Sequence, residues 1–199
     1  MKLFRITLWL AIFALGAFLA YSTVPIMLRG DQSPIAATAD VGGPFTALNA
    51  SGETFGQKDM LGRPHVMFFG FTHCPDICPT TLYEASQWLQ ELGPQGDQID
   101  VYFVSVDPER DTPEALSRYL SGFDPRIKGI TGSLEQISDL ARKWRVFIQK
   151  VGEGDDYTVS HTSNSFLMNS KGQFVRTIAY GENAEVAVSK IKKLLEEEG

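Results

Sequence analysis

The sequence predicts a mixed α/β fold, and three observations support this prediction. Two continuous apolar runs, His65–Phe71 and Ile99–Val106, are typical of central strands that are covered on both faces. Apolar residues at helical spacing over Pro79–Leu92 separate these runs, as in a parallel βαβ unit. A strand–turn–strand signal and an amphipathic helix then close the chain, which predicts a terminal ββα unit.

The expected elements follow one another without repeats. They are a hairpin of Phe45–Leu48 and Glu53–Phe55, strand His65–Phe71, helix Pro79–Leu92, strand Ile99–Val106, a helix from Asp111 to about Phe123, strand Lys128–Thr131, helix Ser133–Trp144, strand Val146–Val151, a hairpin of Ser165–Met168 and Gln173–Ala179, and helix Asn183–Glu198. A leading βαβ and a terminal ββα define thioredoxin-like architecture. The N-terminal hairpin and the middle helix–strand–helix are insertions into that plan.

The N-terminal residues 1–29 form a separate segment. Lys2 and Arg5 precede a long apolar run, which is the pattern of an export signal. A bilayer-spanning helix needs about 20 apolar residues, and residues 8–28 reach that length only by including polar residues and a proline. We expect an uncleaved signal-anchor, although Ala20–Ser22 resembles a cleavage signal. With the two basic residues held inside, the remainder faces outward.

Residues 30–40, rich in small residues, are predicted to be a linker, and residues 41–199 a single domain. Without Lys2 and Arg5 the chain carries 16 basic and 24 acidic residues, a formal charge of −8. Nucleic-acid binding demands clustered Lys and Arg, so this class of partner is excluded.

Cys74 and Cys78 are the only cysteines, and they follow the first core strand where its helix begins. A structural disulfide closing so short a loop would restrain the unfolded chain very little. Reactive groups of open α/β sheets collect beyond the carboxyl ends of the strands, and a helix N-terminus lowers the pKa of a thiol. An i, i+4 pair in a first helical turn can direct both sulfurs to one point. This spacing favours metal chelation and leaves a redox disulfide open.

Two soft thiolates in an oxidising compartment favour copper(I), and they need a third donor. His73 adjoins Cys74 with poor geometry for chelation, and His65 opens a buried strand, so we interpret both as structural. His161 precedes the C-terminal hairpin, in a segment that faces the cysteines in thioredoxin-like folds and usually carries a cis-proline. No proline follows Pro125. We therefore expect His161 to be the third ligand.

Two aspartates follow the second core strand. Asp107 ends that strand, so it should emerge at the same sheet edge as Cys74. It is interpreted as an Asp-Pro turn residue, or as a group that supports a metal ligand or carries a docking charge. Asp111 is expected to cap the following helix, three residues before Glu114.

Three motifs, Gly70–Pro79, Ser105–Pro113 and Val159–Thr162, together resemble the Sco/SenC family, whose members are membrane-tethered copper chaperones that help to assemble the CuA centre of cytochrome c oxidase. The resemblance spans about 43–195. It implies that Cys74, Cys78 and His161 are copper ligands for copper(I) and copper(II). It also implies two partners, the copper-bearing oxidase subunit and another copper carrier. The expected location is the bacterial inner membrane, with the soluble domain in the periplasm.

Two functions from different classes stay open. The first is a metallochaperone that holds copper and passes it on by ligand exchange, and this protein would not be an enzyme. The second is a thiol–disulfide reductase that keeps the copper-site cysteines of the oxidase reduced, with Cys74 as the attacking thiol. A peroxidase is disfavoured because Phe71 stands where peroxiredoxins place Thr or Ser. Structural zinc is disfavoured because it requires four ligands.

Overall fold

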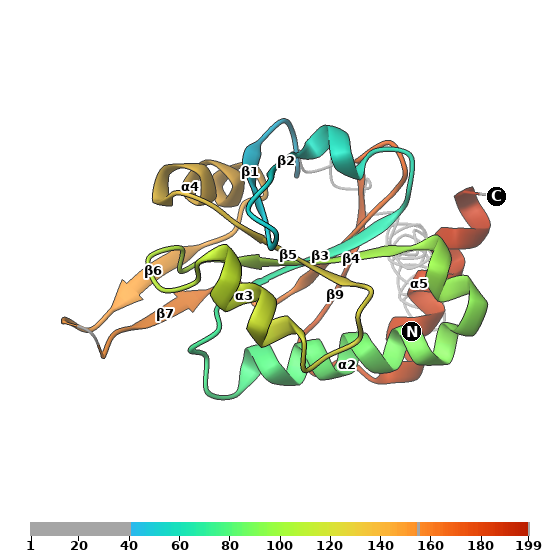
Figure 1. Ribbon diagram of the computed structural model, residues 1–199. Coiled ribbons are helices and arrows are strands. Elements are labelled where there is room, and N and C mark those ends of the chain that lie inside the picture. Colours follow the sequence, from blue (N-terminus) through green and yellow to red (C-terminus); the bar gives the residue numbers. More distant parts are fainter. Residues whose placement is uncertain (1–40, 155, 199) are drawn as a thin grey trace, which may run out of the picture. The chain divides into compact units, whose positions relative to one another are not determined.

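The computed structural model describes residues 41–154 and 156–198, and a seven-stranded sheet lies at the centre of this part (Figure 1). The strands are β1 Thr46–Asn49, β2 Thr54–Gly56, β3 His65–Gly70, β4 Asp100–Ser105, β5 Ile127–Thr131, β8 Ser165–Met168 and β9 Phe174–Ile178. The helices are η1 Gln57–Met60, α2 Ile77–Leu92, η2 Gly93–Gln98, α3 Pro113–Leu120, α4 Leu134–Lys143 and α5 Ala184–Glu198. Strands β6 Ile148–Val151 and β7 Thr158–His161 form a second, two-stranded sheet.

The strand order β2-β1-β5-β4-β3-β8-β9 confirms the predicted thioredoxin-like plan. β3 and β4 are parallel neighbours joined by α2, which is the leading βαβ unit. β8 and β9 pair antiparallel and lead into α5, which is the terminal ββα unit. Gly70 lies opposite Ser105, so β3 and β4 end at the same edge of the sheet.

Helices cover both faces of the sheet (Figure 1). Phe68 and Phe103 pack together on the face covered by α2 and α3. Phe69 packs on the opposite face against Trp144, which directly follows α4. Every residue of β3 is buried. The continuous apolar run therefore predicted a doubly covered strand correctly.

The N-terminal hairpin and the middle insertion extend this sheet. β1 pairs antiparallel with β2 and with β5, and β5 pairs parallel with β4. The predicted hairpin and the predicted strand at 128–131 are thus confirmed. The inserted elements add three strands beyond β4 and leave the βαβ unit intact.

The segment before the C-terminal hairpin differs from the prediction. No strand was predicted over Thr158–His161, but this segment forms β7 and pairs antiparallel with β6. Tyr157 and Val159 are buried while Thr158 and Ser160 are exposed. This alternation covers too few residues to stand out from its polar neighbours.

The predicted anchor at 1–29 and the predicted linker at 30–40 lie outside the described residues. Among residues 41–154 and 156–198, no helix combines the length and the apolar character that crossing a bilayer requires.

His65 opens β3 as a fully buried side chain, and burial lowers its pKa to about 4. Its ring packs edge-on against Tyr102 and also contacts Trp144, and its Nε2 has no hydrogen-bond partner. In the unfolded chain the His65 imidazole has a pKa near 6.5. It therefore binds a proton at pH values at which the folded protein keeps the imidazole neutral. Stability should therefore fall as the pH drops below about 6.5, by about 2 kcal/mol between pH 7.5 and pH 5.

Urea unfolding of His65→Leu across this pH range tests the linkage. Burial also lowers the pKa of His161, which contributes in the same direction, so the difference between the variant and the wild type isolates His65. We expect the variant to lose most of the 2 kcal/mol decline. An unchanged decline would show that His65 does not cause it.

Candidate functional site

The two cysteines lie where β3 passes into α2. Cys74 is half-buried in the connecting loop, and Cys78 is buried as the second residue of α2. The backbone N–H of Cys78 donates to Sγ of Cys74 at 3.4 Å, and the sulfurs are not joined in a disulfide. The helix was predicted from Pro79, but α2 begins at Ile77, so Cys78 lies in its first turn and Cys74 lies before it. The backbone N–H of Cys78, one of the free N–H groups at the start of α2, still donates to the sulfur of Cys74.

Gly70, the last residue of β3, leaves room for the sulfur of Cys78. A Cβ atom at this position would lie 2.9 Å from Sγ of Cys78 and 2.5 Å from the ring of Phe103. Both distances are shorter than real Cβ contacts. The absence of a side chain at Gly70 therefore lets the buried cysteine approach the sheet.

His161, the last residue of β7, comes close to the sulfur of Cys78 from a distant part of the chain. Its Nε2 lies 3.7 Å from Sγ of Cys78, and its ring meets Phe71 edge-on with centroids 6.0 Å apart. Its Nδ1 lies 2.8 Å from the carbonyl oxygen of Thr162. A carbonyl only accepts, so this contact assigns the ring proton to Nδ1 and leaves the Nε2 lone pair facing the sulfur.

Burial controls the protonation of both groups. It lowers the pKa of His161, which keeps the imidazole neutral, while the Thr162 carbonyl acts in the opposite direction. Burial, and then a hydrogen bond from the Cys78 thiol to Cys74, raise the pKa of Cys78, so its thiol is protonated in the absence of a cation. A neutral imidazole nitrogen beside the Cys78 sulfur, with the Cys74 sulfur accepting the Cys78 N–H, offers donors that suit a soft metal ion, which would displace the thiol protons.

Asp111 joins the cysteine loop to the end of β4. Its fully buried carboxylate accepts hydrogen bonds from the N–H and the hydroxyl of Thr72, at 2.9 and 2.6 Å, and from the hydroxyl of Ser105 at 2.6 Å. The prediction that Asp111 caps the helix is wrong, because the hydroxyl of Thr112 accepts the hydrogen bond from Ala115 as the N-cap of α3. A signal was present in the sequence: Pro113 favours the first helical position, which makes the preceding residue the cap.

Asp107 is also buried and fully engaged. Its carboxylate accepts from Nε of Arg110 at 2.5 Å and from the hydroxyl of Tyr157 at 2.6 Å. As predicted, it lies just beyond β4 at the edge of the sheet that carries Cys74. The interpretation as a docking charge is wrong, since only 3% of the residue is exposed and its charge is paired.

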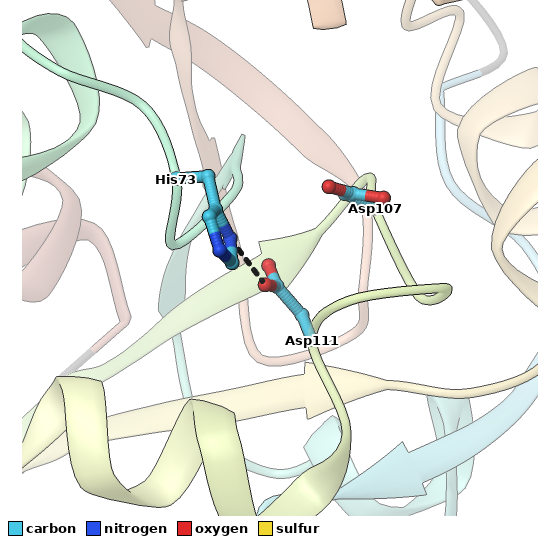
Figure 2. Close-up of side chains that lie close together, drawn as sticks. All are labelled: His73, Asp107 and Asp111. Carbon is cyan, nitrogen blue, oxygen red and sulfur yellow. Dashed lines mark ion pairs between the residues drawn. The ribbon is translucent and has the colours of Figure 1, made fainter. Parts of the chain in front are cut away.

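His73 lies close to both aspartates (Figure 2). Its Nδ1 is 3.8 Å from Oδ1 of Asp111 and 3.1 Å from the hydroxyl of Thr72. One ligand atom from each of His73, Asp107 and Asp111 falls within 4.8 Å of the others. Because Arg110 already neutralises Asp107, and Asp111 accepts three hydrogen bonds, this cluster is better explained as a structural network than as a cation site.

The sequence and structure comparisons agree on the class of protein that this fold and paired-thiol site define. The SCO1/SenC family model matches residues 33–196. The chain is 39% identical over 158 residues to the Arabidopsis thaliana mitochondrial protein SCO1 homolog 1, covering 78% of this chain and 46% of that protein. The chain spans about half the length of the first mitochondrial relatives that it matches.

Solved structures of Sco proteins have the same thioredoxin-like fold as this chain. Bradyrhizobium japonicum ScoI, solved with copper bound, has 39% identity and a TM-score of 0.73, with 77% of this chain and 99% of that chain covered. BsSco, described as a member of the Sco family of cytochrome c oxidase assembly proteins with a disulfide switch, has 26% identity and a TM-score of 0.64, covering 77% and 92%. This chain belongs to the SCO1/SenC family.

Replacing Gly70 tests the close approach at the end of β3. We expect Gly70→Ala to lower the free energy of unfolding by about 1–3 kcal/mol, because the added methyl group must displace Phe103 or Cys78. Gly122→Ala is the matched control, since a Cβ there meets only the Tyr119 carbonyl oxygen at an ordinary 3.7 Å. Chemical denaturation of both variants gives the comparison. Equal stabilities would contradict a packing requirement at Gly70.

Proposed function

We propose that this protein binds copper as its cargo through Sγ of Cys74, Sγ of Cys78 and Nε2 of His161. The observation that carries the proposal is the 3.7 Å approach of the His161 nitrogen to the Cys78 sulfur, between residues far apart in the sequence. The donor set suits copper(I), which favours thiolates, and the imidazole extends the set to copper(II). Support also comes from the copper-bound structure of the related ScoI.

We further propose that the copper is delivered to the CuA site of cytochrome c oxidase during assembly of the enzyme. The proposed three-donor site includes a half-buried ligand in a loop, Cys74, which leaves room for an incoming ligand, so a partner's donor can bind before Cys74 leaves. The similarity to BsSco, a member of the Sco family of cytochrome c oxidase assembly proteins, supports this partner. The proposed partner is therefore the copper-bearing oxidase subunit, and another copper carrier would supply the metal. The membrane anchor and the periplasmic location stay predictions from residues 1–29.

The second candidate function is thiol–disulfide reduction, which the unequal environments of the two thiols favour. Cys74 is the more exposed thiol, and its sulfur accepts the backbone N–H of Cys78. Its thiolate would attack a partner disulfide, form a mixed disulfide and release one partner thiolate. Cys78 would then attack Cys74, release the second partner thiolate and leave a Cys74–Cys78 disulfide. The partner gains two electrons, and an external dithiol reductant must restore the pair.

His161→Ala separates the two candidate functions. We expect copper(I) affinity to fall at least about tenfold, equal to about 1.4 kcal/mol, and the thiolate-to-copper(II) absorption bands to disappear or shift. Disulfide exchange should persist because the reductase chemistry needs no imidazole. His73→Ala is the matched control, since His73 contacts Thr72 and Asp111.

Copper titration with a competing chelator, absorption spectra and a disulfide-exchange assay on the full chain measure these effects. A His161→Ala variant with the affinity and spectrum of the wild type would remove His161 from the site. It would also remove most of the case for a chaperone.

A further inference from the structure

The β6–β7 hairpin carries His161, but it does not belong to the main sheet. Within the described residues, β6 and β7 pair only with each other, and three of the four residues of β6 are exposed. An isolated two-stranded hairpin is marginally stable in water. Contacts between the hairpin and the rest of the domain must therefore decide where His161 lies.

Three polar contacts join the hairpin to the loop that follows β4. The hydroxyl of Tyr157 donates to Oδ1 of Asp107 at 2.6 Å. Nη1 of Arg110 donates to the backbone oxygen of Tyr157 at 3.1 Å. Nζ of Lys150, in β6, pairs with Glu109 at 2.8 Å. The first two contacts involve buried or half-buried groups and converge on Tyr157, which is the residue just before β7.

Two cations fix the ring of Tyr157. The guanidinium carbon of Arg110 and Nζ of Lys150 each lie 3.7 Å from the ring centroid. Both cations therefore contact the aromatic ring at cation–π distance. Burial and the Asp107 carboxylate raise the pKa of Tyr157 to about 12, which keeps the hydroxyl protonated as a donor.

The acceptor of this hydrogen bond is itself held in place. Besides the Tyr157 hydroxyl, the Asp107 carboxylate accepts a charged hydrogen bond from Nε of Arg110. The backbone N–H of Asp107 donates to the hydroxyl of Ser105 at the end of β4. Tyr157 is thereby attached to the same edge of the sheet from which the cysteine loop emerges.

The geometry of β7 passes this attachment on to His161. Alternate residues of a strand share a face, so Tyr157, Val159 and His161 all point toward the domain. At about 3.3 Å per residue, Tyr157 lies about 13 Å from His161 along the strand. A strand that is held at Tyr157 and packed at Val159 presents its last inward residue at a fixed place, where His161 meets Phe71 and Cys78.

We propose that Tyr157 is a positioning residue for His161, and that its hydrogen bond to Asp107 sets the place of the β6–β7 hairpin and of the imidazole it carries. The inference rests on the proposed function for its consequence in metal binding. It makes Asp107 a group that supports a metal ligand through Tyr157, without contact to the metal.

Tyr157→Phe tests this positioning role in the full chain, because it removes only the hydroxyl and keeps the ring beside its two cations. Tyr102→Phe is the matched control. Tyr102 also donates to an aspartate, Asp100 at 3.2 Å, but at the opposite end of β4.

Two measurements on these variants separate positioning from general stability. Without metal, hydrogen exchange of the β6–β7 amides should become about tenfold faster in Tyr157→Phe than in the control, because a charge-assisted hydrogen bond is lost. With copper(II), the thiolate charge-transfer bands should move toward those of His161→Ala, and the copper affinity should fall about tenfold. Tyr102→Phe should keep the wild-type spectrum.

Unchanged hairpin exchange in Tyr157→Phe, or faster exchange with an unchanged copper spectrum, would overturn the proposal. A second variant, Arg110→Lys, keeps a cation beside Asp107 but loses the donor to the Tyr157 carbonyl, so it should shift both readouts in the same direction. If Tyr157→Phe does not fold, the same two measurements on Arg110→Lys test the proposal. If the wild type binds no copper through His161, the proposed function fails, while the exchange measurement still decides whether Tyr157 holds the hairpin.

Discussion

The Asp111 carboxylate lies where the loops that follow β3 and β4 meet, and the rest of the site depends on this contact. It accepts the N–H and the hydroxyl of Thr72, two residues before Cys74, and the hydroxyl of Ser105. A fully buried carboxylate is tolerated only when its oxygens are satisfied, and removing these partners would leave a charge without compensation. The parallel register of β3 and β4 makes the contact possible, because it brings both loops to one edge of the sheet.

One short loop therefore serves both halves of the candidate site. Asp111, at the end of this loop, holds the cysteine segment, and Asp107, four residues earlier, accepts from Tyr157 and so contacts the hairpin that carries His161. Cys78 and His161 come from segments far apart in the sequence, yet each is linked within a few residues to the end of β4. The buried hydrogen-bond networks fix the positions of Cys78 and His161 relative to each other. Apolar packing alone would define these positions less well, because the hydrophobic effect has no direction.

Prediction from the sequence succeeded where a local pattern carries the information and failed where tertiary contacts do. The apolar run of β3 and the helical spacing of α2 defined the βαβ unit, and the unit placed the cysteines. His161 was selected only through the expected fold. The strand β7 was missed because its alternation is short, and the partners of Asp111 were missed because Thr72 lies far from it in the sequence. No local signal identifies Tyr157 as the residue that contacts Asp107.

The unequal burial of the three proposed donors bears on how a cargo would leave. Cys78 is buried against Gly70 and Phe103, and His161 is held by the Thr162 carbonyl and by Phe71. Cys74 lies in the loop before the helix, and it is partly exposed, as is His161. An incoming ligand can therefore reach the site beside Cys74 while the other two donors keep their positions. Under the proposed function, such an order would exchange one donor at a time, so a soft ion would keep a thiolate contact during transfer. The same exposure makes Cys74 the thiol that a partner disulfide would meet first, so a single structural asymmetry serves both candidate functions.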